Sequence, residues 1–526
     1  MALRACEYAW KGGLIFHRPL ILCFDKVRRY SSVSAVSLPD VEGKKIGNDE
    51  SKAPQWKKLD SDELGIRNSM ISEPTRVVLK KLKKNGYEVY LVGGCVRDLI
   101  LNRTPKDFDI VTSAELKEIR TTFHQCEIVG KRFPICHVHV NDSLVEVSSF
   151  STSAGKGGKK LSENFIKPKG CNGRDYIRWR NCIRRDFTIN GLMFDPYAKI
   201  VYDYMGGMED IRKTKVRTVM PANTSFLEDC ARILRAIRIA ARLGFSFSRE
   251  LALSLKQLSR SVLRLDKGRI LMEMNYMLAY GSAEASLRLL WRFGLLEILL
   301  PIQASYFVSQ GFRRRDNGSN MLLSLFSNLD KLVAPDRPCH NSLWICILAF
   351  HKALVDRPRD PLVIAAFALA VHNGGSLVNA VEISRRISRP HDASFHELQE
   401  ASDSNSNQAL IDQIVDLALS IKYSLRKMME RDYVSQAMAK YPRAPCSDLV
   451  FISEALSMRA CKIFECVRRG KEKGYVPRRR NKINYKSLAE GSLPEVRRLF
   501  ARIVSDTVYP PIHGDQNSLV NMNSHS

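Results

Sequence analysis

The feature that most constrains this chain is one change of hydrophobic periodicity near Ala222. Before that residue, short apolar runs typical of strands alternate with helical patterns, and after it apolar residues recur at helical spacing only. This order predicts an α+β fold, in which a small mixed β-sheet head is followed by an all-helical neck, body and tail. With 45% hydrophobic and 26% charged residues, the 526-residue chain is neither collagen-like nor wholly disordered.

The charge and cysteine content narrow the class of partner. A formal net charge of +27 predicts a polyanionic partner, with nucleic acid as the leading class and a solubilising basic surface as the alternative. The longest apolar run, residues 362–371, is well short of the roughly 20 residues that a membrane-spanning helix needs, so we expect no membrane partner. The 13 cysteines include no C-x-x-C pair, which argues against zinc and a disulfide scaffold and suits a reducing compartment.

Residues 1–40 differ from the rest because lysine and arginine are interleaved with apolar residues while acidic residues are scarce. A serine-rich stretch follows, and Arg28-Arg29-Tyr30 resembles a mitochondrial processing site. We therefore expect a transit peptide and a mitochondrial location. A plastid (chloroplast) transit peptide and a non-functional extension are the alternatives.

Composition also divides the remainder of the chain. Residues 41–72 are polar without clear periodicity, which is typical of a linker, and residues 511–526 are typical of a disordered tail. Between these segments we expect a strand-containing head over residues 73–215, a helical neck over 216–301 and a helical body and tail over 302–510.

A pair of glycines joins a predicted strand to a predicted helix. Residues 88–92 are typical of a short buried strand, and Gly93 and Gly94 then open a helix. Glycines let backbone amides approach a phosphate closely, and a helix N-terminus adds positive potential. The pair indicates a phosphate-binding turn, and a turn without a ligand is the alternative.

Two aspartates follow, two residues apart. Residues 104–112 are typical of a turn that leads into a strand, on which Asp107 and Asp109 would share one face. Adjacent carboxylates repel each other unless a cation lies between them, and oxygen ligands favour Mg²⁺ or Mn²⁺. Asp107 and Asp109 are therefore candidate metal ligands, with a solvated pair at a sheet edge as the alternative.

A predicted hairpin supplies a third carboxylate. Residues 135–140 and 144–150 alternate in polarity, and Glu146 faces opposite to its apolar neighbours. Beside the strand that carries Asp107 and Asp109, Glu146 completes the groups needed for two-metal nucleotidyl transfer. These three residues are the candidate catalytic residues.

Five motifs in a fixed order resemble the class II nucleotidyltransferases, the family of tRNA CCA-adding enzymes and bacterial-type poly(A) polymerases. The motifs are GGCVRDLILN (93–102), PKDFDI (105–110), RRDFTIN (184–190), DYMGGMEDI (203–211) and EDCARILRA (228–236), and a weaker one contains KGR (267–269) and Glu273. The resemblance covers residues 77–301. It implies a nucleotidyltransferase head followed by helices that carry RNA.

The resemblance also implies roles for residues at the matching positions. Asp107 and Asp109 are expected to bind the catalytic metals, and Asp229 and Arg232 to read the incoming base. Residues three apart on a helix share a face, so these two side chains can match one base edge, although an amphipathic helix with internal salt bridges has the same pattern. The other nucleotide-binding residues that it implies are Gly93, Gly94, Arg97, Arg185, Asp186, Asn190 and Arg235.

Two activities fit the motifs. A poly(A) polymerase adds AMP from ATP to an RNA 3′-hydroxyl without a template, and Gly130-Lys131-Arg132-Phe133 resembles a segment typical of that branch. A CCA-adding enzyme uses CTP and then ATP on tRNA, and the two share nearly all of these motifs. We expect the poly(A) polymerase, with an RNA 3′ end (mRNA or tRNA) and ATP as partners. An inert RNA-binding scaffold is an alternative of another class.

A second basic segment lies beyond these motifs. Residues 458–486 are rich in lysine and arginine, with Tyr475 and Tyr485 interleaved, which is typical of sequence-independent RNA binding. The candidate RNA-binding residues are Arg468, Arg469, Arg478, Arg479 and Arg480. A solvated basic surface is the alternative.

Overall fold

The computed structural model describes residues 56–130, 134–141, 143–152, 168–399, 406–441, 451–477 and 482–511. From Trp56 onward these residues belong to one unit of packed structure. Several predictions lie outside the described residues: the transit peptide, almost all of the tail, Lys131, Arg132, Phe133, and Arg478, Arg479 and Arg480.

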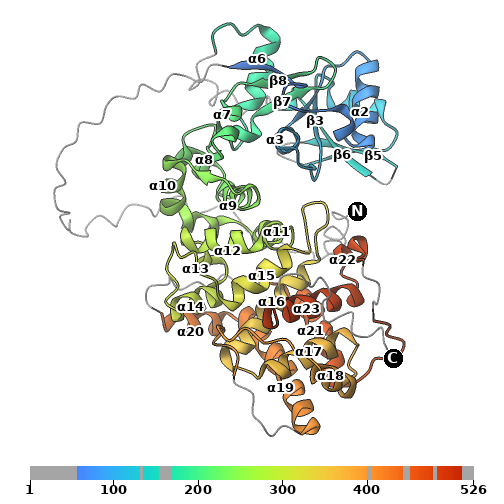
Figure 1. Ribbon diagram of the computed structural model, residues 1–526. Coiled ribbons are helices and arrows are strands. Elements are labelled where there is room, and N and C mark those ends of the chain that lie inside the picture. Colours follow the sequence, from blue (N-terminus) through green and yellow to red (C-terminus); the bar gives the residue numbers. More distant parts are fainter. Residues whose placement is uncertain are drawn as a thin grey trace, which may run out of the picture. The chain divides into compact units, whose positions relative to one another are not determined.

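An eight-stranded mixed sheet forms the first part of the described chain (Figure 1). Its strands, in spatial order, are β1 (Lys57–Asp60), β8 (Ile200–Asp203), β7 (Leu192–Asp195), β2 (Val89–Val92), β3 (Asp109–Thr112), β6 (Ser143–Ser149), β5 (Ile135–Val140) and β4 (Cys126–Val129). Neighbouring strands are antiparallel except β3 and β6, which are parallel. The predicted strand before the glycine pair and the predicted hairpin are confirmed as β2 and as β5 with β6.

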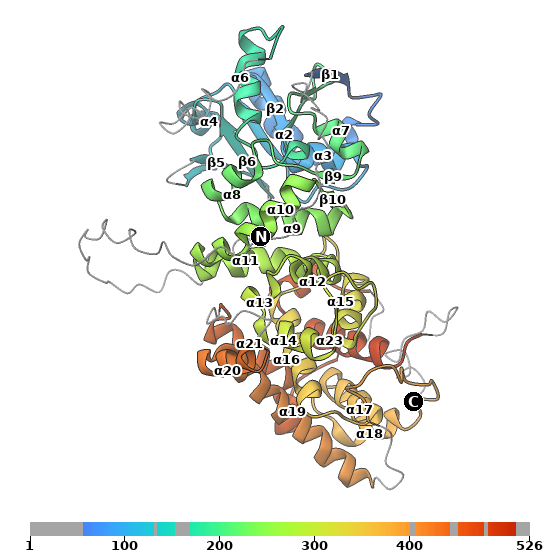
Figure 2. The same cartoon turned by 90° about the vertical axis from the view of Figure 1, so that its left-hand side faces the viewer.

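Strand β2 shows that the sheet is covered on both faces. Val89 and Leu91 pack into the main core, while Tyr90 and Val92 pack into a second cluster on the other face. The helices α2 (Glu73–Lys84), α3 (Gly94–Ile100), α4 (Leu116–Thr122) and α7 (Gly207–Arg212) contribute to the main core. Helix α6 (Gly173–Cys182) brings Trp179 to the second cluster (Figure 2). Because every side chain of β2 is buried, its sequence is apolar throughout.

The first strand corrects one prediction. The sequence predicts a linker over residues 41–72, yet Lys57–Asp60 forms β1 and pairs with the edge of the sheet at β8. The indole of Trp56 stacks on Tyr204 with ring centroids 5.3 Å apart, and its Nε1 donates a hydrogen bond to the Lys169 carbonyl over 2.9 Å. A one-turn helix, η2 (Asn68–Met70), follows. The polar sequence of β1 hides this edge strand from an analysis of apolar periodicity.

After β8 the described chain is helical, apart from the paired two-residue strands β9 (Lys215–Val216) and β10 (Ser246–Phe247). A one-turn helix, η4 (Thr188–Asn190), lies between α6 and β7. The helices that follow the sheet are α8 (Ala222–Glu228), α9 (Ala231–Leu243), α10 (Arg249–Leu258), η5 (Ser259–Arg264), α11 (Lys267–Leu278), α12 (Ala283–Arg292), α13 (Leu296–Leu299) and α14 (Pro301–Ser309). The remaining helices are α15 (Met321–Asp330), α16 (Asn341–Asp356), α17 (Pro361–His372), α18 (Leu377–Ser384), α19 (Asn407–Met429), α20 (Arg431–Ala439), α21 (Glu454–Arg469), α22 (Tyr485–Glu490) and α23 (Leu493–Val508). The predicted α+β fold is confirmed.

The longest apolar run of the sequence forms a core helix. Helix α17 packs against α18, α19, α21 and α23, and all its residues except Leu362 are buried. Among the described helices, none has both the length and the apolar character that crossing a lipid bilayer requires.

Candidate active site

Asp109 and Glu146 lie side by side on two parallel strands. Asp109 is the first residue of β3, and Glu146 is its register partner on β6. Partners across neighbouring strands project from the same face, so the two carboxylates face the same way. The predicted position of Glu146 on the sheet is therefore confirmed, while its catalytic role stays a prediction.

Asp107 reaches this site from a turn, which corrects the prediction that both aspartates lie on one strand. Strand pairing begins only at Asp109, where the backbone meets Val92 of β2 and Glu146 of β6. Asp107 precedes both ladders, and its side chain is 70% exposed, with one carboxylate oxygen 3.4 Å from the Lys106 Nζ. The two aspartates therefore differ in environment, one solvated and the other half-buried.

Negative charge is concentrated at this edge of the sheet. Burial raises the pKa of Asp109 to about 7; Arg185 opposes the shift, and the carboxylates of Asp107 and Glu146 add to it. Burial and Asp107 also raise the pKa of Glu146, against the opposing charge of Lys106. The Asp107 carboxylate thus disfavours ionisation of both Asp109 and Glu146, a condition that a bound cation relieves.

The donor chemistry suits a hard divalent cation. Mg²⁺ binds through one or two carboxylates and keeps water or substrate phosphate oxygens as its other ligands. Asp107 and Asp109 fit this requirement because both offer carboxylate oxygens beside a half-buried negative centre. Within the part of the chain that the structure describes, no group of three or more His, Cys, Asp or Glu side chains is arranged to hold a metal ion by itself.

The turn after β2 brings the backbone close to the carboxylates. Gly93 has a φ of 80°, in the left-handed region that favours glycine. A Cβ at this position would lie 3.1 Å from Nη1 of Arg185 and 3.4 Å from Oδ2 of Asp109. The glycine therefore lets the strand-to-helix turn lie against a guanidinium and a carboxylate, as a phosphate-binding turn next to a metal site requires.

Arg97 is buried and already bonded within the protein. Its guanidinium donates two hydrogen bonds to Asp98 Oδ1, at 2.7 and 3.0 Å, and one to Asn190 Oδ1 at 2.5 Å. Only 4% of Arg97 is exposed, and a Cβ on Gly94 would lie 3.3 Å from its Nη2. These contacts hold the Arg97 guanidinium against Asn190, and its predicted contact with a nucleotide stays a prediction.

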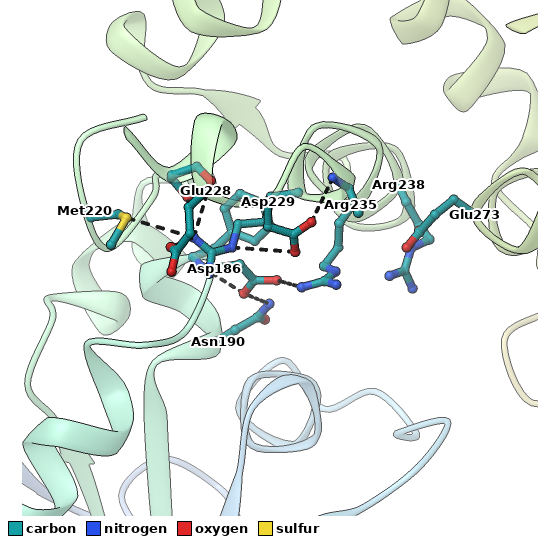
Figure 3. Close-up of polar contacts among 12 residues, drawn as sticks. Asp186, Asn190, Met220, Glu228, Asp229, Arg235, Arg238 and Glu273 are labelled. Atoms are coloured by element: carbon teal, nitrogen blue, oxygen red, sulfur yellow. Dashed lines mark hydrogen bonds and ion pairs between the residues drawn. The ribbon is translucent and has the colours of Figure 1, made fainter. Parts of the chain in front are cut away.

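Asp186 connects this region to helix α9. Its carboxylate accepts hydrogen bonds from Asn190 Nδ2 at 3.0 Å, from the Phe187 backbone at 2.8 Å and from Arg235 Nη1 at 2.8 Å (Figure 3). Burial alone would raise the pKa of Asp186, but the Arg235 charge and these hydrogen bonds outweigh burial and lower the pKa to about 2. Arg97, Asn190, Asp186 and Arg235 thus form one continuous chain of hydrogen bonds.

Asp229 and Arg232 lie at a break between α8 and α9, which corrects the prediction of one helix face. Asp229 ends α8 with an extended backbone, and its Oδ1 accepts a hydrogen bond from the Ala231 backbone over 3.0 Å. Its Oδ2 lies 4.0 Å from Nε of Arg232. Nη1 of Arg232 donates to Glu228 at 2.9 Å and to Ser225 Oγ at 3.0 Å. Because Asp competes for backbone donors, it interrupts the helix while still pairing with Arg232.

Two further ion pairs anchor α9, and the motifs do not assign them. Arg242 Nη2 donates to Asp98 over 3.0 Å, which ties α9 to α3. Arg238 Nε lies 3.2 Å from Glu273 of α11, whose side chain is fully buried and also pairs with Arg269 at 2.9 Å. Figure 3 shows the side chains around Asp186, with Arg238 and Glu273 at one end and Glu228 and Met220 at the other. Asp98 and Glu273 are charged residues among the apolar, buried residues of α3 and α11. This pattern is the sequence signal that could have identified the two pairs.

The described arginines of the predicted RNA-binding segment lie in the last turn of α21. Arg469 pairs with Glu465 over 2.6 Å. Arg468 borders a cavity of about 290 Å³ between α19 and α21, together with Lys422 and Lys462. Helix α21 packs on α16, α17, α19 and α23, so Arg468 and Arg469 are not part of the carboxylate site and their role stays a prediction.

Comparison with known proteins matches two segments of the chain. The family described as "Poly A polymerase head domain" matches residues 89–217, which include the carboxylates, the glycine turn and Asp186. The family described as "Probable RNA and SrmB- binding site of polymerase A" matches residues 244–307, which include α11.

Individual relatives match the same part of the chain. Poly(A) polymerase I of Escherichia coli O6:H1 is 35% identical over 264 residues, which are 49% of this chain and 56% of that protein. The CCA-adding enzyme of Staphylococcus aureus is 32% identical over 216 residues, or 41% of this chain and 52% of that protein. The chain therefore spans little more than half the length of these relatives. The solved Bacillus stearothermophilus CCA-adding enzyme in complex with CTP is 21% identical, with a TM-score of 0.42 over 81% of this chain and 98% of that one.

The matches agree with the order of the motifs and with the sheet that carries them. The head-domain match spans β2 to β9, and the second match begins after α9. Over residues 89–217 and 244–307 the chain is therefore similar to the poly(A) polymerase families, and the same part of the chain is similar to a CCA-adding enzyme.

Proposed function

We propose that this chain is a template-independent RNA 3′-end nucleotidyltransferase, specifically a poly(A) polymerase that transfers AMP from ATP to an RNA 3′-hydroxyl. The proposal rests on how the carboxylates are arranged. Asp109 and Glu146 are register partners, and the charge of Asp107 raises the pKa of both. Gly93 lies against Asp109. Burial of Asp109 disfavours the alternative of a solvated carboxylate pair. Two paired strands can form without three neighbouring carboxylates, whereas two-metal nucleotidyl transfer requires carboxylates close together to bind the cations.

Asp107 and Asp109 are the proposed ligands of Mg²⁺ or Mn²⁺. When bound, the metal pair supplies the charge that acidifies the attacking 3′-hydroxyl and stabilises the leaving pyrophosphate. Arg185 lies on the Gly93 side of Asp109, so it is the proposed triphosphate ligand. Glu146, next to Asp109, is the proposed third carboxylate of the site.

The remaining residues hold the nucleotide. Asp186 and Asn190, fixed by Arg235 and Arg97, are proposed to orient the ribose. Asp229 offers an acceptor and Arg232 a donor, which can pair with the N6 amino group and a ring nitrogen of adenine. Because Glu228 and Ser225 restrain Arg232, the base-reading edge is formed before ATP binds.

Poly(A) addition is preferred to CCA addition on two grounds. Identity to a poly(A) polymerase I is 35% over 264 residues, against 32% over 216 residues for a CCA-adding enzyme. The segment from Gly130 to Phe133 also resembles the poly(A) branch. The partners of the alternative would be CTP, ATP and tRNA. We further propose a mitochondrial location, with a plastid as the alternative, from the composition of residues 1–40.

The test measures incorporation with Mg²⁺ when each single nucleotide is offered with each of two acceptors. The acceptors are an unstructured RNA and a tRNA that lacks its terminal CCA. A long ladder with ATP alone on the unstructured RNA supports the poly(A) polymerase. Addition confined to the tRNA and dependent on CTP and ATP reverses the ranking, and no incorporation on either acceptor rejects the proposed activity.

An inactive variant separates catalysis from RNA binding. Asp107→Ala is expected to abolish incorporation while leaving the Kd for RNA near normal, because Asp107 is solvated and, among the described residues, its ion pair is with its sequence neighbour Lys106. Unchanged incorporation would reject the two-metal assignment.

A further inference from the structure

Lys106, next to Asp107, and two tyrosines in contact with Lys106 have no role in the scheme above. Lys106 Nζ lies 4.6 Å from the ring centroid of Tyr276 and 5.6 Å from that of Tyr280. The two rings are one helical turn apart, with centroids separated by 5.3 Å. Lys106 also lies 3.4 Å from Asp107. We call Lys106, Tyr276 and Tyr280 the lysine–tyrosine cluster; it joins the segment that carries Asp107 to α11 and to Tyr280, two residues beyond the end of that helix.

The cluster is held in place from α9. The Arg238 guanidinium lies 4.9 Å from the centroid of the Tyr276 ring and 3.2 Å from the carboxylate of Glu273. Glu273 is fully buried, so it restrains Arg238, and Arg238 in turn restrains the half-buried ring. The rings are therefore arranged before any ligand arrives, which lowers the entropic cost of binding on them.

The cluster lies where we expect the acceptor RNA, and not where we expect the incoming nucleotide. Gly93 and Arg185 adjoin Asp109, whereas Asp107 adjoins Lys106. The attacking hydroxyl and the leaving pyrophosphate lie roughly in line on opposite sides of the phosphorus. If the triphosphate lies along Gly93 and Arg185, the acceptor approaches from another side, and the cluster borders Asp107 there.

The chemistry of the cluster fits a nucleotide with one phosphate. Aromatic rings stack on any base, and a lysine ammonium is a point-charge ligand for a phosphate. Base stacking is worth more than a partly exposed contact between a cation and a ring. An arriving base would therefore displace the ammonium from the rings and leave it free to contact the phosphate.

We propose that the lysine–tyrosine cluster is the subsite for the 3′-terminal nucleotide of the acceptor RNA. The terminal base stacks on Tyr276 and Tyr280, and Lys106 contacts the phosphate on its 5′ side. The proposal rests on the proposed function and adds the place where the acceptor ends. It assigns α11, which lies within the matched RNA-binding segment, a direct contact with the reacting strand.

The test compares acceptors with and without the terminal base. Two otherwise identical RNAs end in a normal adenosine or in an abasic nucleotide that keeps its 3′-hydroxyl. For the wild-type chain, removal of the base is expected to lower kcat/KM for RNA about tenfold while the KM for ATP is unchanged. For Tyr276→Leu and Tyr280→Leu, removal of the base is expected to have little further effect, since the stacking surface is already reduced.

Control variants, and a measurement on the wild-type chain, distinguish loss of the stacking surface from misfolding of the leucine variants. Tyr276→Phe keeps the ring and should retain the tenfold base effect, and Tyr197→Leu, at an exposed tyrosine between β7 and β8, should retain it as well. Lys106→Met should make the negative slope of log affinity for RNA against log salt shallower by about 0.7. In the wild-type chain, an acceptor ending in 4-thiouridine should photocrosslink to the peptide that contains Tyr276 and Tyr280.

The outcomes separate the two proposals. An equal base effect in wild type and in both leucine variants, or a crosslink on a different peptide, overturns the subsite while leaving the activity intact. Absence of any extension by the wild-type chain rejects the proposed function itself.

Discussion

At the residue scale, Gly93 shows how backbone geometry and charge meet in one place. Its left-handed φ already excludes most residues, and its missing side chain leaves room for Arg185 and Asp109. A second glycine, Gly86, has a similar φ of 86°, but no heavy atom lies within 4 Å of a Cβ built on it. A substitution at Gly86 therefore tests backbone strain alone, whereas the same substitution at Gly93 adds a clash with the neighbouring side chains.

Gly93→Ala and Gly86→Ala are expected to lose about 1 kcal/mol of stability each, because both force a left-handed backbone on alanine. Only Gly93→Ala is expected to lose activity, on the order of 10²-fold in kcat/KM for ATP, since its methyl group displaces Arg185 or Asp109. Denaturant unfolding and nucleotide incorporation check the pair. Equal activity in the two variants would contradict the close approach at Gly93.

Asp186 gives a second prediction at this scale, through its folded-state pKa of about 2, which lies below the ordinary value of 3.8. A lowered carboxylate pKa contributes stability above the unfolded pKa, and that contribution is lost as the pH falls toward the folded value. Asp186→Asn is therefore expected to cost about 2 kcal/mol at neutral pH and progressively less between about pH 4 and pH 2. A difference in unfolding free energy that does not change with pH would show that the Arg235 pair is not its source.

At the element scale, helix α9 organises the site. It brings Arg232 to Glu228, Arg235 to Asp186, Arg238 to Glu273 and Arg242 to Asp98. These four arginines recur every three or four residues, so they line one side of the helix, and its other positions except Ala241 are buried. The same helix therefore connects the residues that we propose to read the base and orient the ribose with α11.

The sequence predicts the elements with strong periodicity and misses those without it. Strand β2 and the hairpin of β5 and β6 are apolar or alternating, and both are confirmed. Strand β1 is polar and is held by Trp56 and by pairing with β8, partners that periodicity cannot reveal. The break at Asp229 carries no Pro or Gly, so the sequence predicts one continuous helix where the structure has α8 and α9.

The resemblance of the motifs implies Asp107, Asp109, Asp186 and Arg235 as site residues, and their roles stay predictions. The hydrogen-bond network around them could not be predicted from the sequence. The bond between Arg242 and Asp98 joins positions 144 residues apart, which one sequence without relatives does not connect. The burial of Arg97 is likewise a consequence of tertiary packing.

Strand β1 can be tested by truncation. A chain that begins at Ser61 is expected to melt roughly 5 °C below one that begins at Trp56, because it loses the ladder with β8 and the stack on Tyr204. Circular dichroism melting curves of the two chains provide the measurement. Identical melting temperatures would mean that residues 56–60 behave as the predicted linker.

At the scale of the whole molecule, one hydrophobic core includes residues of the sheet and of the helices up to α23. One titratable group links distant elements: His340 caps α16 through its Nδ1, 3.1 Å from the Ser342 backbone, and its ring is close to the position of Gly491. Burial and the charge of Arg459 lower the pKa of His340 to about 4. The folded protein therefore holds this imidazole neutral at pH values where the unfolded chain protonates it.

A lowered histidine pKa makes folding weaker as the pH falls from about 6.5 toward 4, because only the unfolded state gains the proton in that window. We expect a loss of about 3 kcal/mol across this range from His340 alone. His340→Asn keeps a capping side chain without a titrating group and should flatten that part of the stability profile. An unchanged profile in the variant would assign the acid sensitivity to another group.

The central claim is that the β3–β6 edge is the place of nucleotidyl transfer. The most direct measurement is pyrophosphate release with ATP, Mg²⁺ and an unstructured RNA, for wild type and Asp109→Asn. We expect the variant to be slower by on the order of 10³-fold, with its RNA affinity and melting temperature near wild type. Release at the wild-type rate by Asp109→Asn would contradict the account, since the carboxylate beside Glu146 would then be dispensable for the chemistry.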